Sequence, residues 1–67
     1  MRYMVEVDRE EDGRWIAEIS SLPGVMAYGE TREMAIGRVE ALALRVVADR
    51  VEHGECREPS VSFSAVG

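Results

Sequence analysis

Apolar and polar residues alternate along two stretches near the start of the chain. A period of two, carried largely by β-branched and aromatic residues, is typical of a half-buried strand. It predicts one strand over residues 2–8 and another over residues 14–20. The Asp12-Gly13 pair between them is typical of a hairpin turn. The side chains expected to face the interior are Tyr3, Val5, Val7, Trp15, Ala17 and Ile19.

The segment LPGV, at residues 22–25, interrupts this alternation. Proline sets φ for the first central position of a type II turn, and glycine supplies the positive φ that the second position requires. A short third strand is then expected over residues 25–29. Residues 60–66 (SVSFSAV) alternate again and predict a fourth strand. Its inward side chains would be Val61, Phe63 and Ala65.

Residues 31–53, TREMAIGRVEALALRVVADRVEH, predict one long helix. Thr31 is a good N-cap, Gly54 is a natural residue to end the helix, and Pro59 prevents it from resuming. The element order is therefore β-β-β-α-β. This order predicts a two-layer α+β domain with the helix on one face of a four-stranded mixed sheet. The fourth strand is expected beside the first and parallel to it.

The chain of 67 residues is long enough for a single domain, over residues 1–67. Domains of this size bury a small core and commonly gain stability from disulfides, metals or association. Cys56 is the only cysteine, which excludes an intrachain disulfide. His53 is the only histidine and has no second soft ligand at a metal-binding spacing. Association is therefore expected, without a metal or cofactor.

The predicted helix carries apolar residues on two faces. At about 100° per residue, one arc is an ordinary core stripe. It consists of Ala35, Ile36, Val39, Leu42, Ala43, Val46 and Val47. The second arc lies roughly opposite, and we call it the helix seam; it consists of Met34, Gly37, Ala41, Leu44, Ala48 and Val51. One sheet cannot cover both arcs.

The helix seam has spacings of 3, 4, 3, 4 and 3 residues, which is the period of a packed helix pair. No charged residue interrupts it, although 31% of the chain is charged. A simpler interpretation is that alanines are good helix formers and that single surface leucines are common. The unbroken spacing favours association through this face, as a homodimer or higher homo-oligomer or with a different partner. An open sheet edge in the third or fourth strand is a second route. The outer sheet face, with Met4 and Ile16 among charges, is a weaker candidate.

Thirteen acidic and eight basic residues give a net charge of −5 and a pI near 4.7. Nucleic-acid binding depends mainly on Lys and Arg, so direct binding of RNA or DNA by this chain is not expected. A basic protein partner fits better, because complementary charge steers association. The chain start lacks the apolar stretch of a signal peptide, and no apolar run approaches the ~20 residues that span a membrane. We therefore expect a cytoplasmic protein without membrane contact.

Seven residues of the expected second and third strands, the turn between them and the helix start form a pattern. They are Ala17, Leu22, Pro23, Gly24, Gly29, Thr31 and Ala35. With these residues in this order, the Asp-Gly hairpin and the late segment GECREPS (residues 54–60), the chain resembles the HicB-like antitoxins over about residues 3–66. The helix seam is a departure, since the family tends to have polar residues at those positions.

The resemblance implies a partially degraded ribonuclease H fold and a non-catalytic role in a type II toxin–antitoxin system. The implied partner is a small basic RNA-cleaving toxin of the HicA type, which family members neutralise; we expect this to occur by covering the toxin's active site. Many family members also carry a C-terminal DNA-binding domain, which the 67 residues do not include, so operator binding by this chain is not expected. A HicB-like domain kept without a toxin, as a self-associating scaffold, is an alternative.

The ribonuclease H resemblance raises another alternative, a residual metal-dependent nuclease. Asp8 resembles the strand-one aspartate of true ribonuclease H enzymes, and we regard it as a vestigial acid. Two-metal phosphoryl chemistry requires several convergent carboxylates. The available partners are Glu6, Glu18, Glu40 and Asp49. The surrounding negative charge would repel the substrate phosphates that magnesium takes as co-ligands, and residues 9–12 are more simply an exposed hairpin tip. We therefore expect that this chain is not an enzyme.

Overall fold

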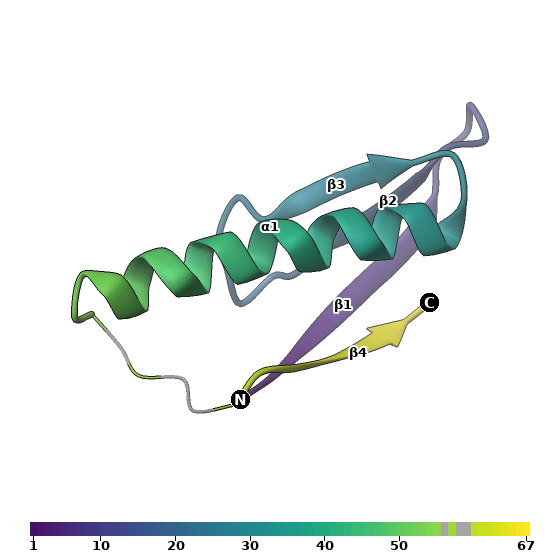
Figure 1. Ribbon diagram of the computed structural model, residues 1–67. Coiled ribbons are helices and arrows are strands. Elements are labelled where there is room, and N and C mark those ends of the chain that lie inside the picture. The colour runs from purple at the N-terminus through teal and green to yellow at the C-terminus, as the bar shows by residue number, and fades with distance from the viewer. Residues whose placement is uncertain (56, 58–59) are drawn as a thin grey trace.

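The computed structural model describes residues 1–55, 57 and 60–67. Its elements follow the order predicted from the sequence (Figure 1). They are β1 (Arg2–Arg9), β2 (Trp15–Glu18), β3 (Met26–Gly29), α1 (Arg32–Glu52) and β4 (Ser62–Val66). The expectations for Cys56 and Pro59 concern residues outside the described part of the chain.

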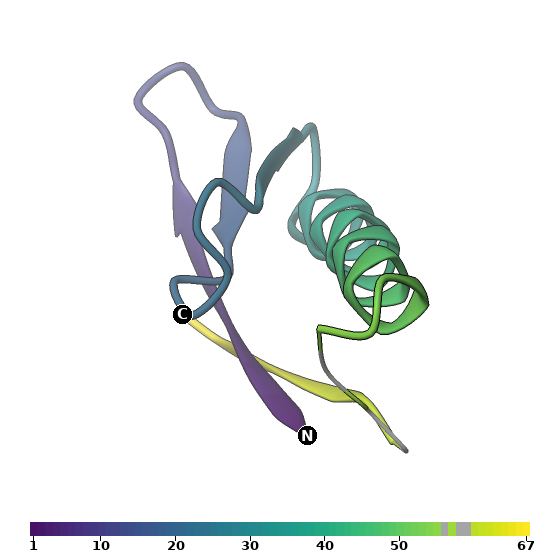
Figure 2. The same cartoon turned by 90° about the vertical axis from the view of Figure 1, so that its left-hand side faces the viewer.

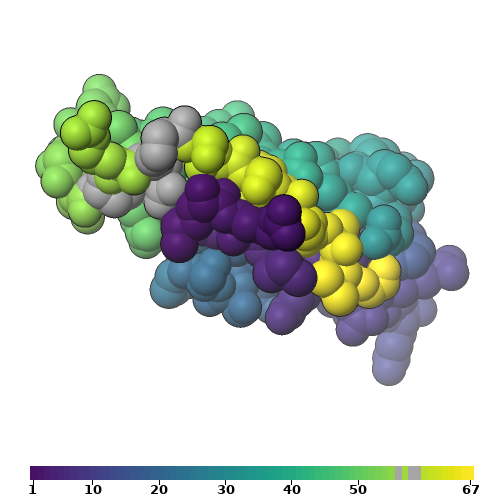
Figure 3. Space-filling view, turned by 90° about the horizontal axis from the view of Figure 1, so that it is seen from below, coloured from purple at the N-terminus to yellow at the C-terminus, as the bar shows by residue number. Residues whose placement is uncertain are grey.

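The four strands form one mixed sheet in the order β3-β2-β1-β4. The β1–β2 and β2–β3 pairs are antiparallel, whereas β4 pairs with β1 in parallel and places Phe63 opposite Tyr3. Figure 3 shows the start of the chain and β4 side by side on one surface. α1 lies across one face of the sheet only (Figure 2). The predicted two-layer α+β fold is confirmed, and β3 and β4 are the sheet edges.

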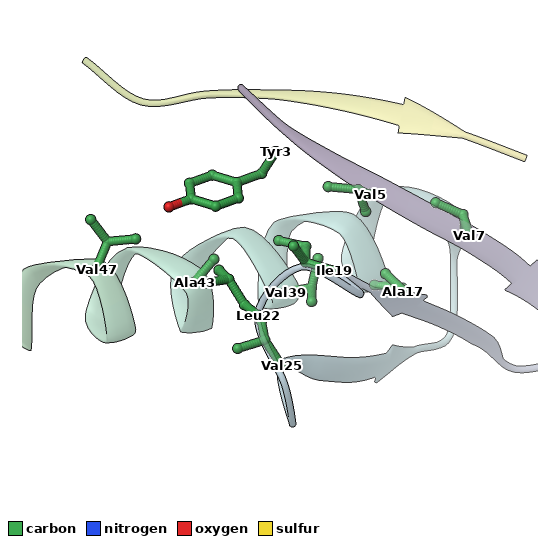
Figure 4. Close-up of a cluster of buried hydrophobic side chains, with 11 residues drawn as sticks. Tyr3, Val5, Val7, Ala17, Ile19, Leu22, Val25, Val39, Ala43 and Val47 are labelled. Carbon is green, nitrogen blue, oxygen red and sulfur yellow. The ribbon is translucent and has the colours of Figure 1, made fainter. Parts of the chain in front are cut away.

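The core lies between α1 and the sheet, and it is wholly hydrophobic among the described residues (Figure 4). It comprises Tyr3, Val5, Val7, Ala17, Ile19, Leu22, Val25, Ala35, Val39, Ala43 and Val47. Burial of each of the larger side chains contributes about 1.5–3 kcal/mol. Trp15 is only half-buried and Ala65 is exposed. The expectation that Ala65 is covered is wrong because α1 makes its main contacts with β3, β2 and β1, and β4 lies at the edge beyond them.

The segment between β2 and β3 closes a compact turn and shortens both strands relative to the prediction. The Val25 amide donates to the Leu22 carbonyl at 3.0 Å, and Gly24 has a φ of +83°, as a type II turn requires. The Ile19 amide donates to the Val25 carbonyl, also at 3.0 Å. Ile19, Leu22 and Val25 are all buried. Residues beyond the strand ends therefore still contribute to the core.

α1 begins where the sequence predicts and ends within one residue of the predicted end, because both ends carry capping residues. The Thr31 hydroxyl oxygen accepts a hydrogen bond from the Met34 amide at 3.1 Å. Beyond the C-cap His53, Gly54 has a φ of +72° and its amide donates to the Val51 carbonyl at 3.1 Å. A glycine in this left-handed conformation is a common helix end. The 21 residues of α1 give a rod about 31 Å long.

The start of α1 passes very close to the end of β3 at Gly29. A Cβ atom on Gly29 would lie 2.5 Å from the Ala35 backbone nitrogen and 2.9 Å from the Met34 carbonyl carbon. Both are backbone atoms, which cannot move aside as the end of a flexible side chain can. Only glycine therefore allows the first turn of α1 to lie this close to the sheet.

The variant Gly29→Ala is expected to lower the free energy of unfolding by about 1–3 kcal/mol, the usual cost of overpacking. Gly37→Ala is the matched control, because a Cβ atom there meets nothing within 4 Å. Since alanine favours a helix interior by about 1 kcal/mol over glycine, this control should be more stable than the parent chain. Urea unfolding followed by circular dichroism measures both. Unchanged stability of Gly29→Ala would contradict the close approach.

Candidate functional site

All six residues of the helix seam are exposed, on the side of α1 that faces away from the sheet. The larger side chains Met34, Leu44 and Val51 have 39%, 49% and 43% of their surface exposed. The opposite side of α1 carries the buried residues Ala35, Val39, Ala43 and Val47. The fold thus covers one of the two apolar arcs and leaves the other uncovered.

The face of the sheet opposite α1 is also uncovered, and it carries three carboxylates. Strand pairing places Glu6 directly opposite Glu18, and Asp8 opposite Ile16. Together with Ile16 and Val66, these acids line a shallow hollow of about 260 Å³. We call Glu6, Asp8 and Glu18 the acidic centre.

Apolar side chains lie beside the acidic centre on the same face of the sheet. On β3, Met26 lies opposite Glu18 and Tyr28 lies opposite Ile16. We call this set the apolar rim; it consists of Met4, Ile16, Met26, Tyr28 and Val66. Four of these five side chains have 40–50% of their surface exposed, and Ile16 is half-buried. The outer face of the sheet therefore combines negative charge with apolar surface.

The pairing of Glu6 with Glu18 opposes folding. Like charges directly opposite on neighbouring strands repel, by an amount comparable with the roughly 0.2–1 kcal/mol that favourable cross-strand pairs contribute. Both side chains are exposed, so water and salt weaken this repulsion without removing it. Local conflicts with the fold are expected where a residue serves another purpose. The pairing of Glu6 with Glu18 therefore indicates the outer face of the sheet as a candidate binding surface.

The structure brings together only some of the carboxylates named for the nuclease alternative: Glu6, Asp8 and Glu18 line one hollow, whereas the two helix acids lie elsewhere. Asp8 is exposed, and its Oδ1 accepts a hydrogen bond from the Arg9 amide at 2.9 Å. Glu40 and Asp49 belong to α1, which lies on the opposite side of the sheet from the acidic centre. Among the residues that the structure describes, no group of three or more His, Cys, Asp or Glu side chains could hold a metal ion.

The tip of the β1–β2 hairpin is ordered by Arg14. The Arg14 amide donates to Asp12 Oδ1 at 3.0 Å, and its Nε donates to Oδ2 at 2.7 Å. These hydrogen bonds, the backbone one most strongly, lower the pKa of Asp12 below its usual value. The Arg14 guanidinium also lies 4.7 Å from the centre of the Tyr28 ring. Residue spacing does not indicate this contact, which joins the hairpin tip to the apolar rim.

The residues that carry the HicB-like resemblance have structural roles in this chain. Three are buried in the core: Ala17, Leu22 and Ala35. The other four shape the backbone: Pro23 and Gly24 in the turn, Gly29 at the close approach and Thr31 at the helix N-terminus. The pattern therefore accounts for how the chain folds, and the surfaces described above lie elsewhere.

Comparison of the chain with protein-family models, with curated proteins and with solved structures finds no match. The resemblance to the HicB-like antitoxins therefore depends on the motif residues alone and stays a prediction. Within the described residues, the chain contains no helix with the length and apolar character that a membrane crossing requires.

Replacing Glu18 with glutamine should raise the free energy of unfolding by up to about 1 kcal/mol, because it removes the repulsion with Glu6 and keeps the side-chain shape. Glu6→Gln should act similarly, and the double variant should gain less than the sum of the two. Urea unfolding at low salt measures all three variants, with Glu55→Gln as an exposed control beyond the helix. Additive gains, or none, would contradict the coupling.

Proposed function

We propose that this chain is a non-catalytic protein-binding module of the HicB-like antitoxin type, with a partially degraded ribonuclease H fold. Its partner would be a small basic RNA-cleaving toxin of the HicA type. The observation that carries the proposal is the acidic centre on the uncovered face of the sheet, with the apolar rim beside it. The motif residues and the β-β-β-α-β order support the same assignment.

The chemistry of the outer face suits a basic, RNA-binding partner. A protein that binds RNA holds phosphates largely with Lys and Arg side chains. Carboxylates form strong charge-assisted hydrogen bonds with those same side chains. The net charge of −5 would accelerate the encounter with a basic protein. Beside the charged contacts, Met26 and Tyr28 offer apolar surface of the kind that contributes most to binding energy when it is buried.

Inhibition would follow from occupation of the toxin's own substrate surface. Side chains that hold the RNA backbone cannot also contact phosphates while they are paired with the acidic centre. The bound module would therefore exclude RNA by both charge and volume, without a chemical step of its own and without a metal or cofactor. A protein with this role acts in the cytoplasm, where the toxin meets its RNA substrates.

The test is titration of the chain against the HicA-type toxin encoded beside its gene, with calorimetry for the Kd and an RNA-cleavage assay for inhibition. The variant Glu18→Lys should raise the Kd about tenfold or more, because it replaces an attractive contact with a repulsive one. Glu55→Lys changes the net charge equally but lies beyond α1, so it should raise the Kd much less. Binding should also weaken as salt concentration rises.

Three results would contradict the proposal. The first is a neighbouring gene region without a short basic reading frame. The second is a toxin that the chain neither binds nor inhibits. The third is equal weakening by Glu18→Lys and Glu55→Lys, which would show that net charge acts without a specific surface.

A further inference from the structure

The helix seam repeats with the spacing of a coiled-coil seam. In heptad notation, the a positions are Met34, Ala41 and Ala48, and the d positions are Gly37, Leu44 and Val51. The seam extends about 26 Å along α1, at 1.5 Å per residue. Because the sheet lies on the other side of α1, the seam is open to another molecule over this whole length (Figure 2).

The residues that flank the seam differ in sign between its two sides. The e positions are Arg38, Arg45 and Glu52, and the g positions are Glu33, Glu40 and Val47. Over the first two heptads one flank is therefore basic and the other acidic. Charges at e and g positions set partner choice and helix orientation in coiled coils. The charge difference between the two flanks therefore limits which partner can pack on the seam, and in which orientation.

A second copy in parallel orientation satisfies all four of these charges. In a parallel pair, each g residue faces the e residue five positions later on the other helix. Glu33 would then face Arg38 of the second copy, and Glu40 would face Arg45 of the second copy. Two-fold symmetry repeats both contacts. In an antiparallel pair, e residues face e residues and g residues face g residues, so Arg would lie beside Arg and Glu beside Glu.

We propose that a second copy of this chain packs on the helix seam as a parallel, two-fold symmetric helix pair, with orientation selected by Glu33 and Glu40 against Arg38 and Arg45. Such a pair uses the same surface on both copies, as a closed dimer requires. Leu44 occupies a d position, where its side chain would pack against its equivalent on the second copy. The open space around Gly37 lets the two backbones approach closely.

The proposed dimer is compatible with the rest of the fold. Two helices in contact would place both sheets on the outside, so each acidic centre stays accessible. The inference therefore goes beyond the toxin-binding function and does not rest on it. It involves different residues, and its failure would leave the outer face of the sheet unaffected.

Charge exchange at Glu40 and Arg45 gives the sharpest test. These residues are five positions apart on one helix, too far around it to pair within a chain, so any coupling between them arises between copies. Arg38 is less suitable, because its Nη1 already donates to the Tyr28 carbonyl at 2.9 Å. The variants Glu40→Arg and Arg45→Glu should each raise the dimer Kd about tenfold, and the double exchange should restore it. Sedimentation velocity over a concentration series measures all four proteins.

The same measurement identifies the opposite orientation. In an antiparallel dimer, each single reversal would relieve a like-charge contact and tighten the dimer. A lower Kd for either single variant therefore overturns the proposal, as does a parent chain that stays monomeric up to millimolar concentration. Failure of the double exchange to restore the Kd also overturns it.

A cross-link at Ala48 tests the register independently. In a background with Cys56→Ser, the variant Ala48→Cys should form an intermolecular disulfide rapidly under mild oxidation, because equivalent a positions face each other in a parallel pair. In an antiparallel pair with Ala48 opposite Gly37, the two Ala48 positions would lie about 16 Å apart along the axis. Cross-linking between Ala48→Cys and Gly37→Cys, without cross-linking between two Ala48→Cys chains, overturns the parallel arrangement.

Leu44→Glu separates this interface from the proposed function. Leu44 is about half exposed, so the variant should keep its circular dichroism spectrum while its sedimentation coefficient falls to the monomer value. Toxin binding per chain should be retained, since the outer face of the sheet is unchanged. A folded Leu44→Glu variant that stays dimeric would overturn the seam as the interface.

Discussion

A single helix has to cover a four-stranded sheet, and this constraint determines which surfaces of the molecule remain uncovered. A helix with its side chains is about 10 Å wide, whereas four strands spaced about 4.8 Å apart form a wider layer. The missing side chain at Gly29 lets α1 lie close to β3. The helix therefore covers β3, β2 and β1, while Ala65 on β4 stays exposed. The back of α1 and the outer face of the sheet are left for solvent or for partners.

The two uncovered faces differ in their chemistry. The helix seam is apolar, and its charges lie only along its flanks, so it suits a surface that can be excluded from water. The outer face of the sheet carries its charges at the centre, which suits a partner of opposite charge. Each face contains a residue choice that opposes stability in the isolated chain: Gly37 in a helix interior and Glu6 opposite Glu18. Each of these two costs in stability is explained if the face that carries it binds a partner.

The element order and the helix boundaries could be predicted because each has a local signal, such as the alternation in β1 or the caps at Thr31 and Gly54. The separation of the two helix arcs follows from helical period alone. Other features depend on tertiary geometry that no local pattern contains. The exposure of Ala65 depends on where α1 lies across the sheet, and the stacking of Arg14 on Tyr28 depends on pairing between separate strands.

The parallel pairing of β1 with β4 also has a consequence for how the chain folds. Arg2 and Ser62 are partners in this pairing although they lie 60 positions apart (62 − 2). Pairing of β1 with β4 closes this long loop, so we expect it to form late, after the hairpins and the helix. The chain loses entropy when the loop closes, before the new contacts contribute stabilising free energy. Until β4 arrives, β1 has an unpaired edge that another chain could join. Charged side chains on β1 discourage such pairing; they are Arg2, Glu6, Asp8 and Arg9. We therefore expect the same carboxylates that mark the outer face of the folded sheet to oppose edge pairing before β4 joins.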